Sequence, residues 1–203
     1  LELHLAEAGI KYFVVDTHGI LNASENPQCG VYAPLDCGNG VAAFGRDPES
    51  SQQVWSSQEG YPGDYDYREY YRDIGFDLDL DYIAPYILDG KTRINTGIKY
   101  HRVTGGNLPK EIYHPKAALA KARRHAQDFI DKRQLQIEQL SARMDRPPII
   151  VAPYDAELFG HWWFEGPTWL EQVLRLASDN ANGVKTVTCS DYLKLQTSHQ
   201  VAM

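Results

Sequence analysis

The 203-residue sequence predicts an α/β fold made of repeated strand and helix units. Two apolar runs carry this prediction. The first covers residues 11–15 and is followed by Asp16 and His18, and the second covers residues 149–152 and is followed by Asp155. Continuous apolar runs are typical of buried parallel strands. Because parallel strands of such folds carry their chemistry at their carboxyl ends, both acids are expected on one face.

The first half of the chain shows capping and turn signals between the apolar segments. Asp47 before Pro48 predicts a helix start, with an N-cap acid and proline at the first helical position. Gly9 predicts a helix end. In order, we expect a helix over residues 1–8, strands over 11–15 and 41–44 around a loop over 21–40, a helix over 48–55, a turn over 60–64, and a helix over 67–74.

The second half is dominated by one long helix. From Pro115 to Met144, apolar residues recur every three or four positions, which predicts an amphipathic helix with a buried stripe. In order, we expect irregular structure over 76–95, a strand over 96–104, the helix over 115–144, the strand over 149–152, a helix from Pro167, a strand over 184–188, a turn capped by Ser190-Asp191, and no regular element after residue 195.

Composition limits the classes of function. The formal net charge of −7 argues against nucleic acid binding, which needs a basic surface. No apolar run approaches the ~20 residues of a membrane span, and no signal peptide is evident, so a cytoplasmic location and no membrane partner are expected. Cys29, Cys37 and Cys189 are expected to be free thiols, although a bridge between the first two is possible.

Asp155 is the strongest catalytic candidate. It stands at a strand end among Tyr154, Trp162 and Trp163, and aromatic rings suit the C–H faces of a sugar. A general acid/base is one interpretation of Asp155, and an N-cap of the turn after it is the other. Asp16 and His18 are similarly either catalytic or a pair that holds a loop. The histidines lack metal-ligand spacing and no nucleotide fingerprint occurs, so neither a metal nor a cofactor is expected.

A second group of aromatic residues lies in the first half of the chain. It either forms a platform on which sugars stack or packs in the core, and the pattern alone leaves both interpretations open. The group consists of Trp55, Tyr65, Tyr67, Tyr70 and Tyr71.

Residues 155–167, which read Asp-Ala-Glu-Leu-Phe-Gly-His-Trp-Trp-Phe-Glu-Gly-Pro, resemble the fourth sequence region of family 57 glycoside hydrolases, most closely that of the 1,4-α-glucan branching enzymes. Supporting runs are residues 13–19, 44–50, 60–64, 67–73 and 96–100. The resemblance implies an incomplete (β/α)7 barrel and a retaining mechanism acting on amylose or glycogen. The chain begins without Met and within a helix, so residues 1–203 are expected to be the C-terminal part of this barrel domain, truncated at both ends.

The resemblance also implies roles for individual residues. Asp155 matches the acid/base of the family, whereas the nucleophilic Glu is expected upstream of residue 1. The missing N-terminal half of the barrel and a helical C-terminal domain are expected partners within a longer chain, and the piece alone is expected to be inactive. Residues 22–40 match a mobile loop. Positions implied to contact glucan are Arg46, Gly63, His18, His161, Trp162 and, at the loop tip, Tyr32.

Three other functions remain open at this point. Another activity of the same family, an α-amylase or a 4-α-glucanotransferase, fits the same motifs. A glucan-binding module without catalytic activity is the alternative from another class. A metal-dependent barrel of the polysaccharide deacetylase type is disfavoured because its Asp-Asp and His-x-x-x-His ligand patterns are missing.

Overall fold

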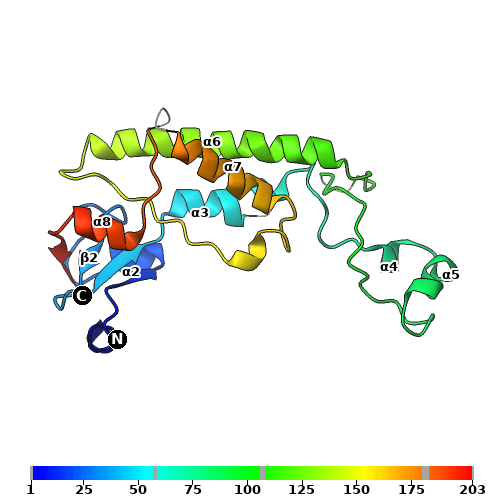
Figure 1. The fold of residues 1–203 in the computed structure, drawn as a ribbon, viewed down its shortest axis with the longest axis horizontal. Coiled ribbons are helices and arrows are strands. Elements are labelled where there is room, and N and C mark those ends of the chain that lie inside the picture. The colour runs from blue at the N-terminus through cyan, green and yellow to red at the C-terminus, as the bar shows by residue number, and fades with distance from the viewer. Residues whose placement is uncertain (1, 57–58, 106–107, 180–182, 203) are drawn as a thin grey trace. The chain divides into compact units, whose positions relative to one another are not determined.

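The computed structural model describes residues 2–56, 59–105, 108–179 and 183–202. The chain forms two compact units, each assembled from separate stretches of sequence. Figure 1 shows the ribbon coloured by residue number. Unit 1 comprises Leu1–Gln53, Phe129–Tyr154 and Leu174–Met203, and unit 2 comprises Val54–Asp128 and Asp155–Val173. Both units are therefore closed by contacts between residues far apart in the chain.

The described elements confirm an α/β fold. Unit 1 contains α1 (Glu2–Glu7), β1 (Tyr12–Val15), α2 (Thr17–Leu21), β2 (Leu35–Asp36), β3 (Ala42–Gly45), α8 (Cys189–Leu195) and β4 (Gln200–Val201). Unit 2 contains η1 (Tyr61–Gly63), α4 (Ile74–Asp77), α5 (Leu80–Ile83), η2 (Ala84–Tyr86) and η3 (Ala156–Leu158). Residues of α3 (Pro48–Trp55), α6 (Pro115–Ser141) and α7 (Gly166–Ser178) fall in both units.

The sheet of unit 1 has the order β1-β3-β2-β4. Strand β3 is parallel to β1 and antiparallel to β2, and β2 is parallel to β4. The expected strand over residues 149–152 is reduced to a single parallel bridge between Val151 and Arg46. Strand β2 already occupies Ala42 and Ala43 on that side of β3, so the second apolar run can pair only beyond the end of β3.

Both faces of this sheet are covered by apolar side chains. Ala43 and Leu35 pack with Ile20 of α2 on one face, whereas Ala42 and Phe44 pack with Tyr192 of α8 on the other. This alternation follows from the two-residue period of a strand. Gly45 is required where α2 crosses the sheet, because a Cβ there would lie 2.7 Å from Ile20 Cγ1.

Helix α3 starts as its sequence predicts. Asp47 is fully buried, and its Oδ2 accepts a hydrogen bond of 2.8 Å from the backbone N–H of Ser50. Its Oδ1 accepts from Gln136 Nε2 at 3.0 Å and from the Tyr32 hydroxyl at 3.2 Å. Asp47 therefore caps α3 and also ties it to the C-terminal half of α6 and to the segment over residues 22–40.

Helix α6 confirms the long apolar stripe and ends three residues earlier than expected. Ala118, Ala122, Ala126, Phe129 and Ile130 are buried, at the spacing of three and four residues that one helix face requires. In α7, which begins near Pro167 as expected, Ala177 is buried whereas Leu174 is 51% exposed.

The helix expected over residues 67–74 is not formed. The segment before α4 is extended, with Glu69 N–H bonded to His101 O at 2.9 Å and Val103 N–H bonded to Tyr67 O at 2.8 Å. The strand expected over 96–104 is likewise reduced to the isolated bridges Arg68–Arg102 and His101–Ile112. These partners are distant in sequence, so their hydrogen bonds outweigh the local helical preference.

Asp73 fixes the segment over residues 94–98 to the start of α4. Its buried carboxylate accepts hydrogen bonds from Gly75 N–H, Thr96 N–H, the Thr96 hydroxyl and Gly97 N–H, at 2.8–2.9 Å. Burial alone raises the pKa of this carboxyl, but the bonds from Thr96, Gly75 and Gly97 outweigh that effect and the pKa is lowered.

The C-terminal part of the chain departs from the sequence prediction in three places. Residues 184–188 form no strand. The cap of α8 is Thr188, whose hydroxyl accepts from Asp191 N–H at 3.1 Å, rather than Ser190. Strand β4 forms at Gln200–Val201, where no element was expected. In the first half, α2 is also an addition, and Cys29, Cys37 and Cys189 are free thiols.

Replacing Asp47 by Ala is expected to lower the free energy of unfolding by about 2 kcal/mol, because it removes a helix cap and leaves two buried donors without their acceptor. Urea unfolding followed by circular dichroism measures this loss. Asp81→Ala, at an exposed acid of α5, is the control and is expected to change stability by less than ~0.5 kcal/mol. Equal stabilities for both variants would contradict the capping role.

Asp73 is expected to make stability depend on pH. Because its folded-state pKa lies below the unfolded value of ~3.9, its stabilisation is full above that value and is lost as the pH falls through the folded pKa. Urea unfolding between pH 7 and pH 3 should show wild type converging on Asp73→Asn. Asp79→Asn is the matched control, since Asp79 precedes α5 without a side-chain capping bond. A constant difference between wild type and Asp73→Asn over this range is the contrary result.

Candidate functional site

The segment after Asp155 is a tightly wound loop of unit 2. Helix η3 begins directly after Asp155, and Phe159 then forms a bridge with Trp163. Gly160 N–H donates to Trp163 O, and Trp163 N–H donates to Leu158 O, both at 2.8 Å. Gly160 has a φ of 93°, a conformation that favours glycine. The loop is thus closed by its own backbone.

Two adjacent tryptophans of this loop have opposite environments. The Trp163 ring is buried, with its centroid 5.4 Å from that of Trp169 and 5.5 Å from that of Tyr67. The Trp162 ring is 44% exposed. Gly166 allows the loop to lie against this core, because a Cβ there would lie 2.9 Å from the Phe159 ring. The buried Trp163 ring holds the loop in place, and the Trp162 ring lies at the surface.

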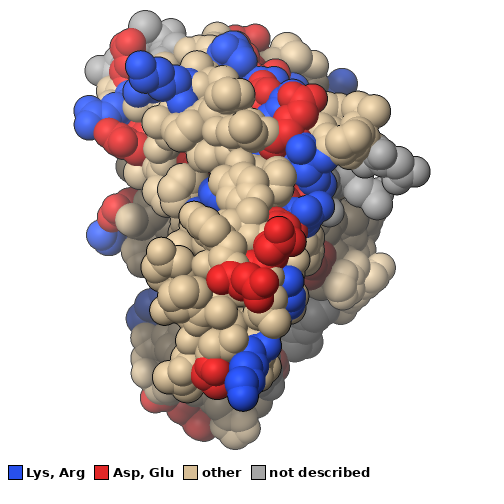
Figure 2. Space-filling view, turned by 90° about the vertical axis from the view of Figure 1, so that its right-hand side faces the viewer, with Lys and Arg blue, Asp and Glu red and all other residues tan. Residues whose placement is uncertain are grey.

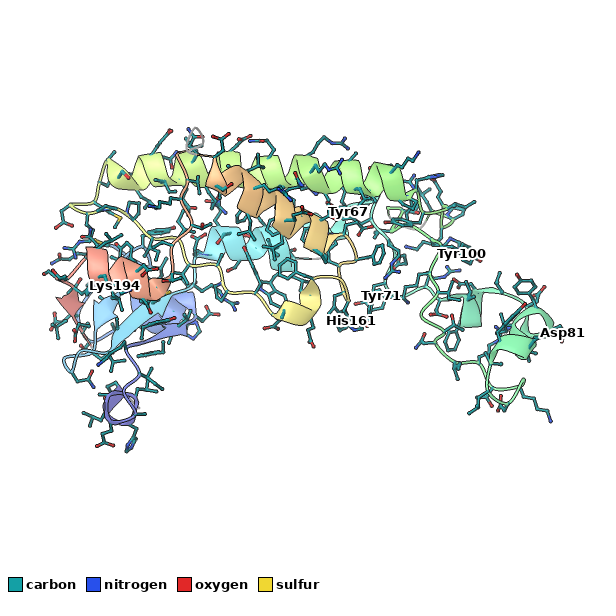
Figure 3. All side chains as sticks on the ribbon, in the orientation of Figure 1. Tyr67, Tyr71, Asp81, Tyr100, His161 and Lys194 are labelled. Carbon is teal, nitrogen blue, oxygen red and sulfur yellow. The ribbon has the colours of Figure 1, made fainter. Side chains whose placement is uncertain are left out.

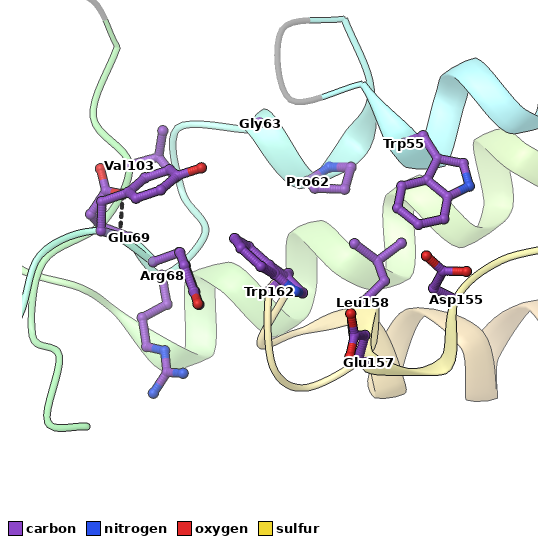
Figure 4. Close-up of a pocket in the computed structure, with 12 residues that line it drawn as sticks. Trp55, Pro62, Gly63, Arg68, Glu69, Val103, Asp155, Glu157, Leu158 and Trp162 are labelled. Atoms are coloured by element: carbon purple, nitrogen blue, oxygen red, sulfur yellow. Dashed lines mark hydrogen bonds between the residues drawn. The ribbon is translucent and has the colours of Figure 1, made fainter. Parts of the chain in front are cut away.

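A cavity of about 430 Å³ lies beside this loop, and all of its lining residues belong to unit 2. In the view of Figure 4 it extends from Trp55 and Asp155 at one end to Arg68 and Glu69 at the other. Its walls mix aromatic and aliphatic side chains with carboxylates and one guanidinium. The lining residues are Trp55, Pro62, Gly63, Arg68, Glu69, Tyr70, Tyr71, Val103, Asp155, Glu157, Leu158 and Trp162.

Asp155 presents its carboxylate to this pocket. The residue is exposed and occupies the N-cap position of η3, but its side chain makes no capping hydrogen bond. The capping interpretation therefore lacks its defining contact. Glu157, two residues further on, is also exposed and lines the same pocket. The carboxylate of Asp155 is available for a ligand.

Tyr70, His161 and Trp162 form an aromatic wall, although Tyr70 is far from the other two in sequence. Tyr70 stacks on Trp162 with ring centroids 4.3 Å apart and an angle of 29°. His161 packs edge-on against both rings, and its Nε2 lies 3.4 Å from the Tyr70 hydroxyl. Figure 3 labels His161 and Tyr71 in this region. Trp55, Tyr70 and Tyr71 line the pocket, Tyr65 is exposed, and Tyr67 is buried in the core. A sugar platform stays a prediction for the residues that line the pocket.

The buried acid Glu165 lies behind the pocket and bonds to Arg68, one of its lining residues. Glu165 is 1% exposed, and its Oε1 accepts from the Tyr113 hydroxyl at 2.6 Å and from Arg68 N–H at 3.1 Å. Its Oε2 is buried and has no partner among the described residues. Burial raises the pKa of Glu165 despite the bonds from Tyr113 and Arg68. The Arg68 guanidinium lies 3.7 Å above the Phe164 ring, which fixes its side chain on the pocket wall.

The remaining predicted site residues lie in unit 1. His18 Nδ1 is 3.5 Å and Arg46 Nη1 is 3.8 Å from the Asp16 carboxylate, so these three side chains form one solvent-facing group. Tyr32 is half-buried, and its hydroxyl donates to Asp47. Of the predicted residues, Gly63, His161 and Trp162 therefore lie with Asp155, and the others lie within unit 1.

Sequence reasoning missed Arg68, Glu69 and Glu165. Arg68 and Glu69 lie where the sequence predicts a helix that does not form, and Glu165 lies in the motif of residues 155–167, whose pattern assigns it no role. Glu165 stands between Phe164 and Gly166 in an otherwise apolar run. An acid is rarely buried without a partner, so its place there indicates a carboxyl group with hydrogen-bond partners.

Three further properties of the described residues are relevant to function. Nowhere in them do three or more His, Cys, Asp or Glu side chains converge to form a metal site. No helix within the described ranges combines the length and apolarity needed to cross a membrane. On the face shown in Figure 2, acidic and basic side chains are interspersed among neutral ones.

Comparison with known proteins matches nearly the whole chain. No family model matches it. A 1,4-alpha-glucan branching enzyme of Thermococcus kodakarensis is 34% identical over 96% of the chain, and a probable 1,4-alpha-glucan branching enzyme of Mycobacterium tuberculosis is 37% identical over 94%. The chain spans about a third of the length of these curated relatives, 28% and 32% respectively.

Solved structures also match nearly the whole chain, and they include both an alpha-amylase and branching enzymes. The alpha-amylase AmyC of Thermotoga maritima matches 100% of the chain with a TM-score of 0.91 and 47% identity, over 39% of its own chain. A branching enzyme of family 57 type from Pyrococcus horikoshii matches 98% with a TM-score of 0.78 and 36% identity, over 33% of its own chain. These matches cover the loop after Asp155 and the sheet of unit 1 alike. The chain belongs to glycoside hydrolase family 57.

Proposed function

We propose that this chain is part of a retaining 1,4-α-glucan branching enzyme that acts on amylose or glycogen in the cytoplasm. The observation that carries the proposal is the exposed Asp155 carboxylate, which lines an aromatic pocket and makes no capping bond. The names of the relatives support the same activity. We further propose that residues 1–203 form part of an incomplete (β/α)7 barrel, which the longer protein completes together with a helical domain.

In this mechanism Asp155 is the general acid/base. Its protonated carboxyl donates to the glycosidic oxygen as the α-1,4 bond breaks, while a second carboxylate of the longer protein forms an ester with the sugar carbon. Asp155 then takes the proton of an acceptor 6-hydroxyl, whose oxygen attacks the anomeric carbon of the bound sugar and releases the second carboxylate. The product carries an α-1,6 bond, and both carboxyl groups return to their starting states.

The other side chains bind and orient glucan in this proposal. Trp162, stacked on Tyr70, offers a ring to the C–H face of a sugar, and His161 hydrogen-bonds a hydroxyl beside it. Gly63 lets a glucan approach the backbone of η1 closely. Arg46, His18 and Tyr32 remain predicted glucan contacts, the first through its planar donor fork.

An α-amylase is the second candidate, because the AmyC structure shares 47% identity with this chain. Incubating the full-length protein with amylose separates the two. Branching transfers a segment, so α-1,6 linkages accumulate while the number of reducing ends stays constant. Hydrolysis instead raises the number of reducing ends without new linkages. Linear products alone would refute branching.

Asp155→Asn in the full-length protein is expected to lower turnover by about 10²–10⁴-fold, because a general acid/base is lost while an isosteric side chain remains. Transfer from amylose, measured as new α-1,6 linkages, is the assay. Asp81→Asn removes the same charge from an exposed position in α5 and should leave turnover unchanged. Near-normal activity of Asp155→Asn would falsify its assignment.

Trp162→Ala is expected to weaken glucan binding roughly two- to tenfold, because one stacking surface is removed and the Tyr70 ring loses its support. The rise should appear in KM for amylose more than in kcat. Tyr82→Ala, at an exposed aromatic residue of α5, controls for the loss of a surface ring. An unchanged KM in Trp162→Ala would show that no sugar stacks there.

A further inference from the structure

Unit 2 carries a second depression, separate from the Asp155 pocket. It has a volume of about 760 Å³ and shares only Gly63 with the first pocket. It is lined by the η1 region, by Arg102 and by one face of α6. The lining residues are Glu59, Gly60, Tyr61, Gly63, Asp64, Tyr65, Asp66, Arg102, Lys121, Arg124, His125 and Asp128.

Tyr65 presents an exposed aromatic ring in this depression. Its side chain is 61% exposed, although its backbone is held firmly. The Tyr65 carbonyl accepts hydrogen bonds from Thr104 N–H at 3.2 Å and from Arg102 Nη1 at 3.3 Å. An exposed ring on a fixed backbone loses little conformational freedom when a ligand stacks on it.

The ring also rests against bare backbone. A Cβ at Gly105 would lie 2.2 Å from Tyr65 Cζ, so only glycine permits this approach. Thr104, just before it, is buried and has a φ of 50°, a strained conformation for a branched residue. Its hydroxyl accepts from Glu111 N–H at 3.1 Å, which holds the turn. The chain thus accepts local strain where Gly105 supports the Tyr65 ring.

The polar groups around Tyr65 are fixed by one another. Lys121 Nζ lies 3.1 Å from Asp64 Oδ2 and 3.0 Å from Asp66 Oδ2, and Asp66 Oδ1 accepts from Arg102 at 2.9 Å. The hydrogen bond from Lys121 lowers the pKa of Asp66, so this acceptor stays ionised at neutral pH. The groups therefore offer acceptors and donors at set positions, which suits the adjacent hydroxyls of a sugar.

The charge balance favours a neutral ligand over an anion. Four acids (Glu59, Asp64, Asp66 and Asp128) face three cationic side chains (Arg102, Lys121 and Arg124), and burial lowers the pKa of His125, the remaining base. A phosphate group would meet carboxylates beside Lys121 and Arg102, whereas an uncharged polyhydroxylated chain can bond with both signs. We propose that this Tyr65 groove is a second binding surface for α-1,4-glucan, outside the Asp155 pocket. The proposal rests on the glucan activity proposed above.

Affinity electrophoresis of the full-length protein through gels containing glycogen tests this surface. Tyr65→Ala is expected to raise the dissociation constant for glycogen roughly two- to tenfold. Gly105→Ala keeps the tyrosine but displaces its ring, and should show the same rise. Tyr86→Ala, at a ring that is 78% exposed in η2 and outside the groove, is the matched control and should bind normally.

The measurement is repeated in the Asp155→Asn background, so that binding is judged without catalysis. Glycogen binding that survives Asp155→Asn and weakens on adding Tyr65→Ala supports the groove, whatever reaction the enzyme performs. Unchanged mobility of both Tyr65→Ala and Gly105→Ala overturns it. If Asp155→Asn retains activity on amylose, the proposed function fails instead, and the binding result still stands on its own.

Discussion

The burial of the Trp163 ring is the constraint on which the candidate site depends. The indole packs against Trp169 and Tyr67, and Trp163 is bonded through its backbone to Leu158 and Gly160. Removing the ring from this core would release both ends of the loop at once. With it in place, Trp162 cannot also turn inward, so a large aromatic surface stays exposed beside Asp155. The burial of the Trp163 ring, which the hydrophobic effect favours, therefore keeps the Trp162 ring at the surface.

The segment that carries the buried Trp163 ring also carries a buried acid, Glu165. Glu165 lies two residues after Trp163 and holds Arg68 and Tyr113 through a single oxygen. A buried carboxyl is costly unless it is hydrogen-bonded. The hydrogen bonds from Arg68 and Tyr113 therefore stabilise this carboxyl group together. Because Arg68 also lines the pocket, the shape of the wall is coupled to the loop that carries Asp155.

The sequence predicted elements whose determinants are local. The cap of α3 by Asp47 and the stripe of α6 depend on residues within one or two turns, and both are observed. The helix prediction over residues 67–74 was wrong because Asp73 and Glu69 form hydrogen bonds with residues 96–101. These partners lie too far along the chain to influence a prediction from local sequence. The pocket was predictable only in part, because local sequence does not show which distant residues come together. Asp155 and Trp162 share one motif, whereas Arg68 and Tyr70 reach it only through tertiary packing.

The two depressions of unit 2 differ in how their carboxylates are held, and this difference bears on their roles. Asp64 and Asp66 share the Lys121 ammonium group, whose hydrogen bond lowers the pKa of Asp66. Such acids are suited to binding hydroxyls without exchanging protons. Asp155 makes no capping bond and sits beside aromatic rings, so a sugar that fills the pocket would remove water from it. In the proposed mechanism the Asp155 carboxylate is therefore the one that exchanges a proton with the sugar, whereas Asp64 and Asp66 are held by Lys121.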